Sequence, residues 1–96
     1  MKGGHVYIMA DRYRGTIYIA VTAQLPARIY QHRTGDGSDF CKRYALDRLV
    51  YAEFHTNIGE AIAGEKAMKK WNRSWKIRLI EEQNPDWLDL FDTLNA

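Results

Sequence analysis

Cysteine is almost absent from this chain, and long apolar runs are absent altogether. The one cysteine among 96 residues, Cys41, has no partner for an internal disulfide, so a reducing compartment is expected. No apolar run reaches the length that spans a bilayer, and the run at residues 6–9 is too short for a signal peptide. These absences argue against a secreted or membrane protein and predict a soluble, cytoplasmic domain.

Acidic residues are missing from one stretch and basic residues from another, although the net charge is only +2. Residues 1–78 hold all 14 Lys and Arg and seven of the 12 acids, whereas residues 79–96 hold the other five acids. Six bases lie between residues 66 and 78 without an acid: Lys66, Lys69, Lys70, Arg73, Lys76 and Arg78. This stretch is either a face for a phosphate backbone or a solvated helix face balanced by the acidic tail.

Two alternating segments predict a β-hairpin at the start of the chain. Residues 5–10 and 16–21 alternate between the two faces of a strand, and residues 11–15 form a connection that ends in Gly15. A turn centred on Arg12 and Tyr13 would make Tyr7 and Tyr18 direct cross-strand neighbours. Both tyrosines would then lie on the face opposite the aliphatic side of the hairpin.

The rest of the chain predicts four helices and one more strand. Pro26 suits the first turn of a short helix that ends by residues 35–37, followed by a loop over residues 34–41. A strand is expected over residues 48–54, a helix over 57–71, and another from a Ser74 cap to about Gln83. Asp86 should open the last helix, because Trp87, Leu90, Phe91 and Leu94 form an apolar stripe.

The predicted order is β-β-α-β-α-α-α in one domain over residues 1–96. The expected fold class is α/β (α+β), a three-stranded, mainly antiparallel sheet flanked by helices. The residues expected to supply much of the core are Val6, Ile8, Ile17, Ile19, Leu49, Val50, Ile62, Ile77, Ile80, Trp87 and Phe91.

Glu65 occupies a position where an apolar residue is expected. It falls within the stripe of Ile58, Ala61, Ile62 and Met68 on the helix over residues 57–71. An ionised carboxylate is rarely buried unless it is paired, hydrogen-bonded or bound to a cation. Glu65 is therefore either a partner of a buried base such as Arg28 or a functional carboxylate.

Taken in order along the chain, several short motifs resemble the GIY-YIG endonuclease superfamily, and in particular its small stand-alone bacterial members. The resemblance covers nearly the whole chain and depends on order and spacing rather than on any single motif. The matching segments are His5-Val6-Tyr7, Tyr18-Ile19-Ala20, Arg28 with His32, Lys42-Arg43-Tyr44, Glu65, Trp71-Asn72-Arg73-Ser74-Trp75-Lys76 and Asn84-Pro85-Asp86-Trp87.

The resemblance implies a metal-dependent DNA endonuclease that hydrolyses phosphodiester bonds in DNA repair or processing. It implies Tyr7 as general base, helped by Tyr18, and Arg28 as the group that stabilises the transition state. His32 would tune a tyrosine or relay a proton, and Glu65 would be the one protein ligand to Mg²⁺ or another divalent cation. The residues expected to bind substrate are Lys42, Arg43, Tyr44, Lys66, Lys69, Lys70 and Arg73.

Two positions depart from the family pattern. His5 and Ala20 stand where its motifs have glycine, and a methyl group at Ala20 leaves less room for a close approach. One alternative is therefore a catalytically silent DNA-binding module on the same fold. Another is a protein-interaction domain that uses exposed aromatics such as Tyr13, Tyr30 or Tyr51. Specificity would have to come from a homodimer or a protein partner, or be low.

Overall fold

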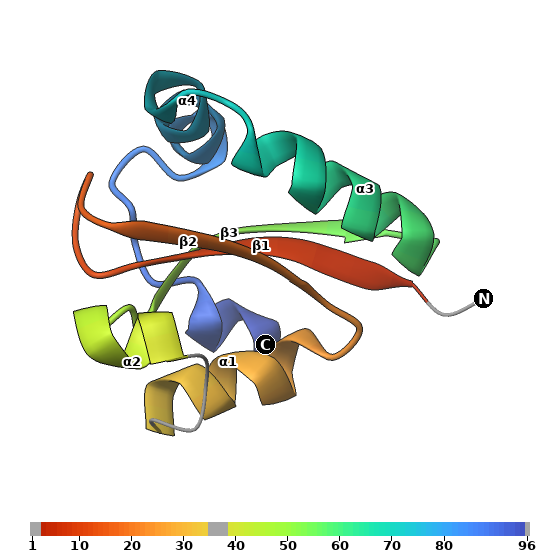
Figure 1. The fold of residues 1–96 in the computed structure, drawn as a ribbon. Coiled ribbons are helices and arrows are strands. Elements are labelled where there is room, and N and C mark those ends of the chain that lie inside the picture. Colours follow the sequence, from red (N-terminus) through yellow and green to blue (C-terminus); the bar gives the residue numbers. More distant parts are fainter. Residues whose placement is uncertain (1–2, 35–38, 96) are drawn as a thin grey trace.

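The computed structural model describes residues 3–34 and 39–95, which form three layers (Figure 1). The middle layer is an antiparallel sheet of β1 (Gly4–Ala10), β2 (Ile17–Thr22) and β3 (Arg48–His55), in the order β2-β1-β3. α3 (Ile58–Lys69) and α4 (Arg73–Gln83) cover one face. α1 (Leu25–Thr34), α2 (Asp39–Tyr44) and the 3₁₀ helix η1 (Phe91–Asn95) cover the other. The expected fold class is confirmed. No helix in the described ranges is long and apolar enough to cross a membrane.

The hairpin register differs from the prediction by two residues. Tyr7 pairs with Ala20, and Tyr18 pairs with Met9, so the two tyrosines are diagonal rather than direct neighbours on one sheet face. The turn is centred one residue later than expected, because Arg14 adopts a left-handed backbone (φ 52°) and Gly15 follows it. A Cβ on Gly15 would lie 2.0 Å from Asp11 Oδ1, so glycine is required there.

The predicted loop over residues 34–41 is partly wrong. A short helix, α2, begins at Asp39, while residues 35–38 lie outside the described part. The helix ends at Tyr44, and the left-handed backbone of the next residue, Ala45 (φ 55°), lets the Leu46 amide donate to the Cys41 carbonyl at 2.9 Å. This cap was not recognised from sequence because such a position usually holds glycine.

Asparagine side chains cap α3 and α4, the two helices that lie above the sheet in Figure 1 and form the upper layer; α1, α2 and η1 form the lower layer. Asn57 accepts from the Gly59 amide at 2.7 Å at the start of α3. Asn72 accepts from the Trp75 amide at 3.0 Å, so α4 begins before Ser74 and the predicted Ser74 cap is wrong. Asparagine is among the best N-cap residues, and its oxygen replaces the intrahelical acceptor that the first amides lack.

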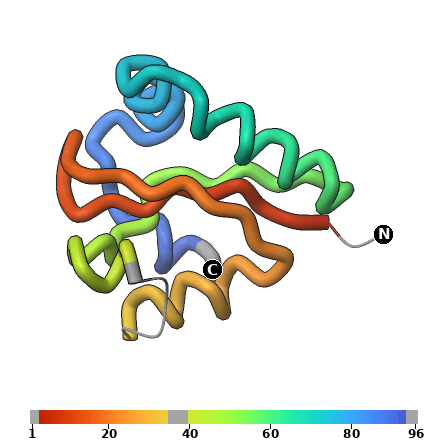
Figure 2. The backbone as a smooth tube through the Cα atoms, viewed as in Figure 1, coloured from red at the N-terminus to blue at the C-terminus, as the bar shows by residue number. Residues whose placement is uncertain are grey.

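The segment after α4 lies along the outer edge of β3 instead of forming the helix predicted from Asp86. It passes from the upper layer to the lower one (Figure 2). The Leu90 amide donates to the Leu49 carbonyl at 2.7 Å, and buried Asn84 donates from Nδ2 to the Val50 carbonyl at 3.0 Å. Because the Leu90 amide is used on β3, it cannot donate to a helical carbonyl, and the Asn84 side chain holds the start of the segment against the same strand. The segment covers one sheet edge and leaves β2 as the other.

The core consists of two clusters, one on each face of the sheet. The upper cluster includes Val6, Ile8, Ile19, Val50, Ile80 and Trp87, and the lower one includes Leu49. Ile17 and Ile77 pack partly buried against the first cluster, and Phe91 against the second. The prediction for Ile62 is wrong, because its side chain is 39% exposed: it lies beyond the narrow stripe through which α3 contacts the sheet.

Glu81 ties α4 to the hairpin turn and to the C-terminal segment. Its carboxylate accepts from Arg14 Nε and Nη2, both at 2.7 Å, and from Trp87 Nε1 at 2.8 Å. The hydrogen bond from Arg14 and that from Trp87 lower the pKa of Glu81 from 4.5 to about 2. A carboxyl with a lowered folded-state pKa stabilises the fold above its unfolded pKa and loses that contribution as pH falls.

We therefore expect Glu81→Gln to lower the midpoint of thermal unfolding at pH 7. The difference in melting temperature between the variant and the unaltered protein should shrink as the pH falls from 4.5 to about 2. Over this range Glu81 becomes protonated and, like glutamine, uncharged. Circular dichroism melts over this pH range would test it. Glu82→Gln, one position along the same helix, is the matched control. A difference that stays constant down to pH 2 would contradict the assignment.

Candidate active site

A hydrogen bond between Tyr7 and His32 lies at the centre of the lower layer. Tyr7 projects from β1 toward α1, where its hydroxyl lies 2.9 Å from His32 Nε2. Tyr7 is fully buried and His32 is 6% exposed. The other ring nitrogen of His32, Nδ1, is buried without a hydrogen-bond partner in the described ranges. The pair therefore joins strand and helix and leaves one buried imidazole nitrogen unsatisfied.

Arg28 completes a polar chain with Tyr7 and His32. It lies one helical turn before His32 on α1 and is half-buried. Its guanidinium lies close enough to Tyr7 for each group to shift the pKa of the other, and it donates to Gln31 Oε1 at 3.2 Å. The Tyr7 oxygen has two lone pairs, so it can accept from His32 Nε2–H while it faces the Arg28 guanidinium, which leaves the lone pair of His32 Nδ1 free.

Burial sets the protonation of this chain. It raises the pKa of Tyr7 to about 12, although the hydrogen bond from Arg28 acts in the opposite direction. Burial also lowers the pKa of His32, and the positive charge of Arg28 lowers it further. At neutral pH Tyr7 is therefore a phenol and His32 a neutral imidazole.

Aromatic side chains from α2 form the outer wall of the cluster. Tyr18 meets His32 edge-on, with ring centroids 6.1 Å apart, and stacks on Phe40 at 5.8 Å. Phe40 in turn contacts Tyr44 at 4.8 Å. Tyr18 is half-buried, whereas Phe40 and Tyr44 are exposed. Tyr18, and not Tyr7, is thus the tyrosine at the solvent side of the cluster.

Phe40 and Cys41 were not recognised as neighbours of this site from sequence. Phe40 fell in a predicted loop, so nothing indicated that it would cover Tyr18. Cys41 was expected to be inert, and it is buried in the apolar cluster that includes Tyr7 and Leu25. Its placement on a short helix, which the sequence pattern did not predict, brings it to the site.

Glu65 lies on α3, in the layer on the other side of the sheet (Figure 1). Its side chain is 14% exposed and pairs with Lys69 at 3.2 Å. Its half-buried place between Ala61 and Met68 matches the sequence pattern. α3 packs on β1 and β2, so the edge strand β2 separates Glu65 from Arg28. The structure thus brings four of the five predicted catalytic residues into one cluster and places Glu65 across the sheet.

The predicted substrate-binding residues divide between the two layers. Lys42, Arg43 and Tyr44 are exposed on α2, beside the cluster. Lys66, Lys69 and Lys70 are exposed on or just after α3. Arg73 donates to the carbonyls of Arg14 and Gly15 at 2.8 and 2.5 Å, which fixes the hairpin turn. Arg73 therefore has a structural contact that competes with any contact to substrate.

Ala20 and His5, the two departures from the glycine pattern, have different surroundings. Ala20 is 8% exposed and packs in the lower cluster opposite Tyr7, so its methyl group fills space beside the site. His5 contacts Phe54, with ring centroids 5.2 Å apart. His5 lies two residues before Tyr7 on the same face of β1, and its ring turns to Phe54 on the neighbouring strand β3.

Residues 3–78 match the GIY-YIG catalytic domain. The chain belongs to the GIY-YIG family. GIY-YIG proteins are a family of nucleases. The resemblance seen in the order of the sequence motifs is therefore confirmed. The match includes both tyrosines, Arg28, His32 and Glu65 and ends within α4.

Several small staphylococcal proteins are similar to this GIY-YIG chain. A UPF0213 protein of Staphylococcus haemolyticus is 32% identical over 83 residues, which are 86% of this chain and 100% of that protein. A UPF0213 protein of Staphylococcus epidermidis is 31% identical over 71% of this chain and 83% of its own length. No solved structure matches the chain significantly.

Proposed function

We propose that this GIY-YIG protein is a metal-dependent endonuclease that hydrolyses phosphodiester bonds in DNA. The observation that carries the proposal is the chain from Arg28 through Tyr7 to neutral His32, with Tyr18 on its solvent side. It combines a fixed positive charge with a proton acceptor. Phosphodiester hydrolysis needs both, one for the phosphoryl oxygens and one for the attacking water.

Arg28 would stabilise the negative charge that develops on the phosphoryl oxygens. Its planar guanidinium matches two phosphate oxygens at once, and the Tyr7 contact fixes its orientation before substrate binds. Because it is half-buried, its charge is less screened by water than that of an exposed lysine.

His32 would accept the proton of the attacking water at Nδ1, its nitrogen without a partner in the described ranges, and Tyr18 would hold that water at the rim. His32 is suited to this role because its lowered pKa keeps it neutral at pH 7. Tyr7 would act as a positioning residue, since it is fully buried and its pKa is about 12. This assignment moves the role of general base, which the family resemblance implies for Tyr7, to His32.

Glu65 would hold the divalent cation. One carboxylate suits Mg²⁺, which keeps most of its waters and takes further oxygens from phosphate. The Lys69 partner is 50% exposed and can turn to solvent, so the carboxylate can exchange an ammonium for a metal ion. When bound, the metal would supply positive charge to a phosphate of the bound strand. A DNA strand lying across the β2 edge could then contact Arg28 on one side and Glu65 on the other.

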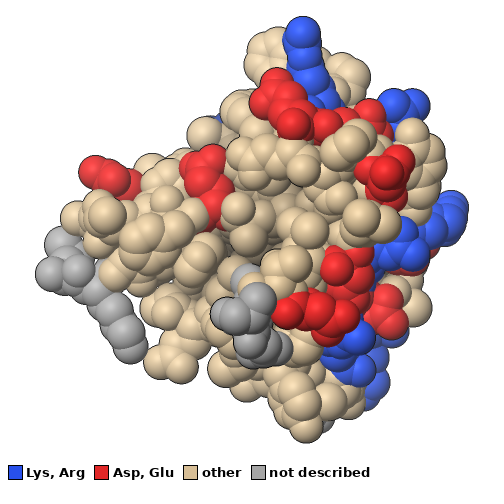
Figure 3. Space-filling view, turned by 180° about the vertical axis from the view of Figure 1, so that it is seen from behind, with Lys and Arg blue, Asp and Glu red and all other residues tan. Residues whose placement is uncertain are grey.

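Charge favours DNA on the β2 side of the protein. Seen from behind, acidic side chains are spread over the face, while Lys and Arg are confined to its top and right-hand margin (Figure 3). The five acids within residues 79–96 lie at the end of α4 and in the segment that covers β3. A polyanion would be repelled from such a face. The β2 edge, with Lys42 and Arg43 on nearby α2, is the better approach.

Cleavage of labelled single-stranded, nicked, flapped and branched DNA would test the proposal. We expect cleavage in Mg²⁺ that is abolished by EDTA and strongly reduced in Glu65→Gln. Glu60→Gln, an exposed carboxylate in the first turn of the same helix, is the matched control and should retain activity.

Two other results would contradict the nuclease assignment. Salt-dependent DNA binding without cleavage of any substrate would indicate a silent DNA-binding module. Absence of DNA binding at low salt would favour the protein-interaction domain. For that domain Tyr13 and Tyr30 are exposed as expected, whereas Tyr51 is buried and was wrongly included.

A further inference from the structure

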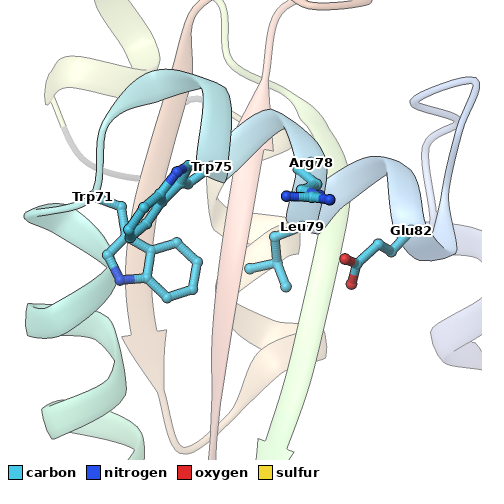
Figure 4. A pocket seen from close by; sticks show the side chains of 5 residues that line it. All are labelled: Trp71, Trp75, Arg78, Leu79 and Glu82. Atoms are coloured by element: carbon cyan, nitrogen blue, oxygen red, sulfur yellow. The ribbon is translucent and has the colours of Figure 1, made fainter.

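A groove lined by tryptophan lies in the upper layer, away from the Arg28 cluster. Trp71 lies between α3 and α4, while Trp75, Arg78, Leu79 and Glu82 project from α4 (Figure 4). The groove has a volume of about 210 Å³. Trp75 lies edge-to-face on Trp71, with ring centroids 6.1 Å apart at 74°. Its side chain is 56% exposed, which is unusual for so large an apolar surface.

Positive charge lies at this groove, because Arg78 lines it and Lys70 directly precedes Trp71 in the chain. Three of the six bases between residues 66 and 78 are engaged: Lys69 with Glu65, Arg73 with the hairpin turn, and Lys76 with the Lys69 carbonyl. Lys66, Lys70 and Arg78 make no ion pair within residues 3–34 and 39–95. Cations beside an exposed indole are the combination by which proteins bind single-stranded nucleic acid, with bases stacked on aromatic rings.

Glu82 adds a hydrogen-bond acceptor at the far end of the groove. Arg78 and Glu82 lie one helical turn apart, yet they do not form an ion pair with each other. Both groups are therefore available to a ligand. A carboxylate at the edge of a stacked base accepts from an exocyclic amine such as cytosine N4 and repels a carbonyl oxygen such as thymine O4.

We propose that this groove binds an unpaired nucleotide of single-stranded DNA, so that the enzyme recognises unpaired strands at a surface separate from its cleavage site. The base would stack on Trp75, Arg78 and Lys70 would contact its phosphates, and Glu82 would accept from its amine. The inference rests on the proposed function in taking DNA as the ligand. A duplex presents no free base face and would not use the groove.

Binding of single-stranded oligonucleotides in EDTA tests the groove without cleavage. Labelled oligo-dC and oligo-dT of roughly 15 nucleotides, a length typical of small single-strand sites, would be titrated by fluorescence anisotropy. We expect Trp75→Ala to weaken oligo-dC binding on the order of tenfold or more, since one stacked base contributes that much. Trp75→Phe should keep most of the affinity. Phe54→Ala, an equally exposed aromatic on β3, should keep all of it.

Unchanged affinity of Trp75→Ala for oligo-dC would overturn the proposal and leave the groove to a protein partner. Equal affinity of the unaltered protein for oligo-dC and oligo-dT would overturn the role of Glu82. If the unaltered protein prefers oligo-dC, Glu82→Gln should reduce the ratio of its affinities for oligo-dC and oligo-dT. Because EDTA prevents cleavage, failure of the groove is distinguishable from failure of the nuclease, which the Mg²⁺ assay measures with Trp75 intact.

Discussion

Replacing Arg28 with alanine is expected to lower kcat/KM for DNA cleavage by about 10²–10³-fold, by analogy with loss of one preorganised oxyanion donor. Arg28 is held by Tyr7 in the lower layer, so its guanidinium needs little reorganisation when charge develops on the phosphoryl oxygens. Arg28→Lys should recover only part of the rate, because an ammonium keeps the charge but not the planar fork. Single-turnover cleavage in Mg²⁺ would measure both variants.

Arg33 offers a matched control for Arg28. It lies on the same helix, where it pairs with Asp89 and stacks over the Phe91 ring at 4.7 Å. Arg33→Ala removes the same charge from α1 without touching the Tyr7 contact. We expect it to change the salt dependence of DNA binding slightly and the cleavage step little. Equal losses in both variants would show that Arg28 acts through general electrostatics and not at the phosphoryl group.

The sequence predicts the sheet well because strand patterning with a period of two is a strong local signal. The strands, their antiparallel arrangement and the common face of Tyr7 and Tyr18 all follow from it. The hairpin register does not follow, because it depends on the left-handed backbone of Arg14, which no residue type at that position indicates. Because the turn is centred one residue later than predicted, the pairing partner of Tyr7 changes by two residues, from Tyr18 to Ala20. The two tyrosines stay on the same face of the sheet.

The C-terminal segment shows how tertiary contacts override a helical pattern. Trp87, Leu90 and Phe91 have helical spacing, yet Trp87 is fully buried with a left-handed backbone (φ 55°). Its indole donates to Glu81, and its carbonyl accepts from Arg48 at 3.0 Å. These long-range bonds satisfy the segment better than a helix on the surface would, because they also close the edge of β3. Local periodicity carries no information about such partners.

The sequence predicted which residues form the site better than it predicted where they lie relative to one another. Arg28 and His32 were placed together by their spacing of four on one helix, and Tyr7 by its strand face. The burial of Tyr7 was not predicted, since it depends on packing between α1, α2 and the sheet. That burial raises the pKa of Tyr7 and transfers the solvent-facing position to Tyr18. The layer in which Glu65 lies likewise depends on topology and not on spacing.

The pH dependence of cleavage should identify the proton acceptor. If His32 accepts the proton, log kcat/KM should be flat through neutral pH and fall with unit slope below the pKa of His32. This pKa lies below 6.5 because of burial and the charge of Arg28. The sign follows from protonation, because an imidazolium cannot accept the proton of water. A tyrosine base would instead give a rate that continues to rise with pH above 9, since phenols ionise near pH 10.

Replacing His32 with glutamine should reduce the rate by about 10²–10⁴-fold, the range for loss of a general base, and remove the acidic limb. His5→Gln is the matched control, because the pKa of His5 is also lowered by burial but its ring contacts Phe54 of β3 instead of the Tyr7 hydroxyl. It should leave both rate and profile unchanged. An acidic limb that persists in His32→Gln would assign the titration to metal-bound water. A near-normal rate in that variant would remove His32 from the reaction and leave it as the group that positions Tyr7.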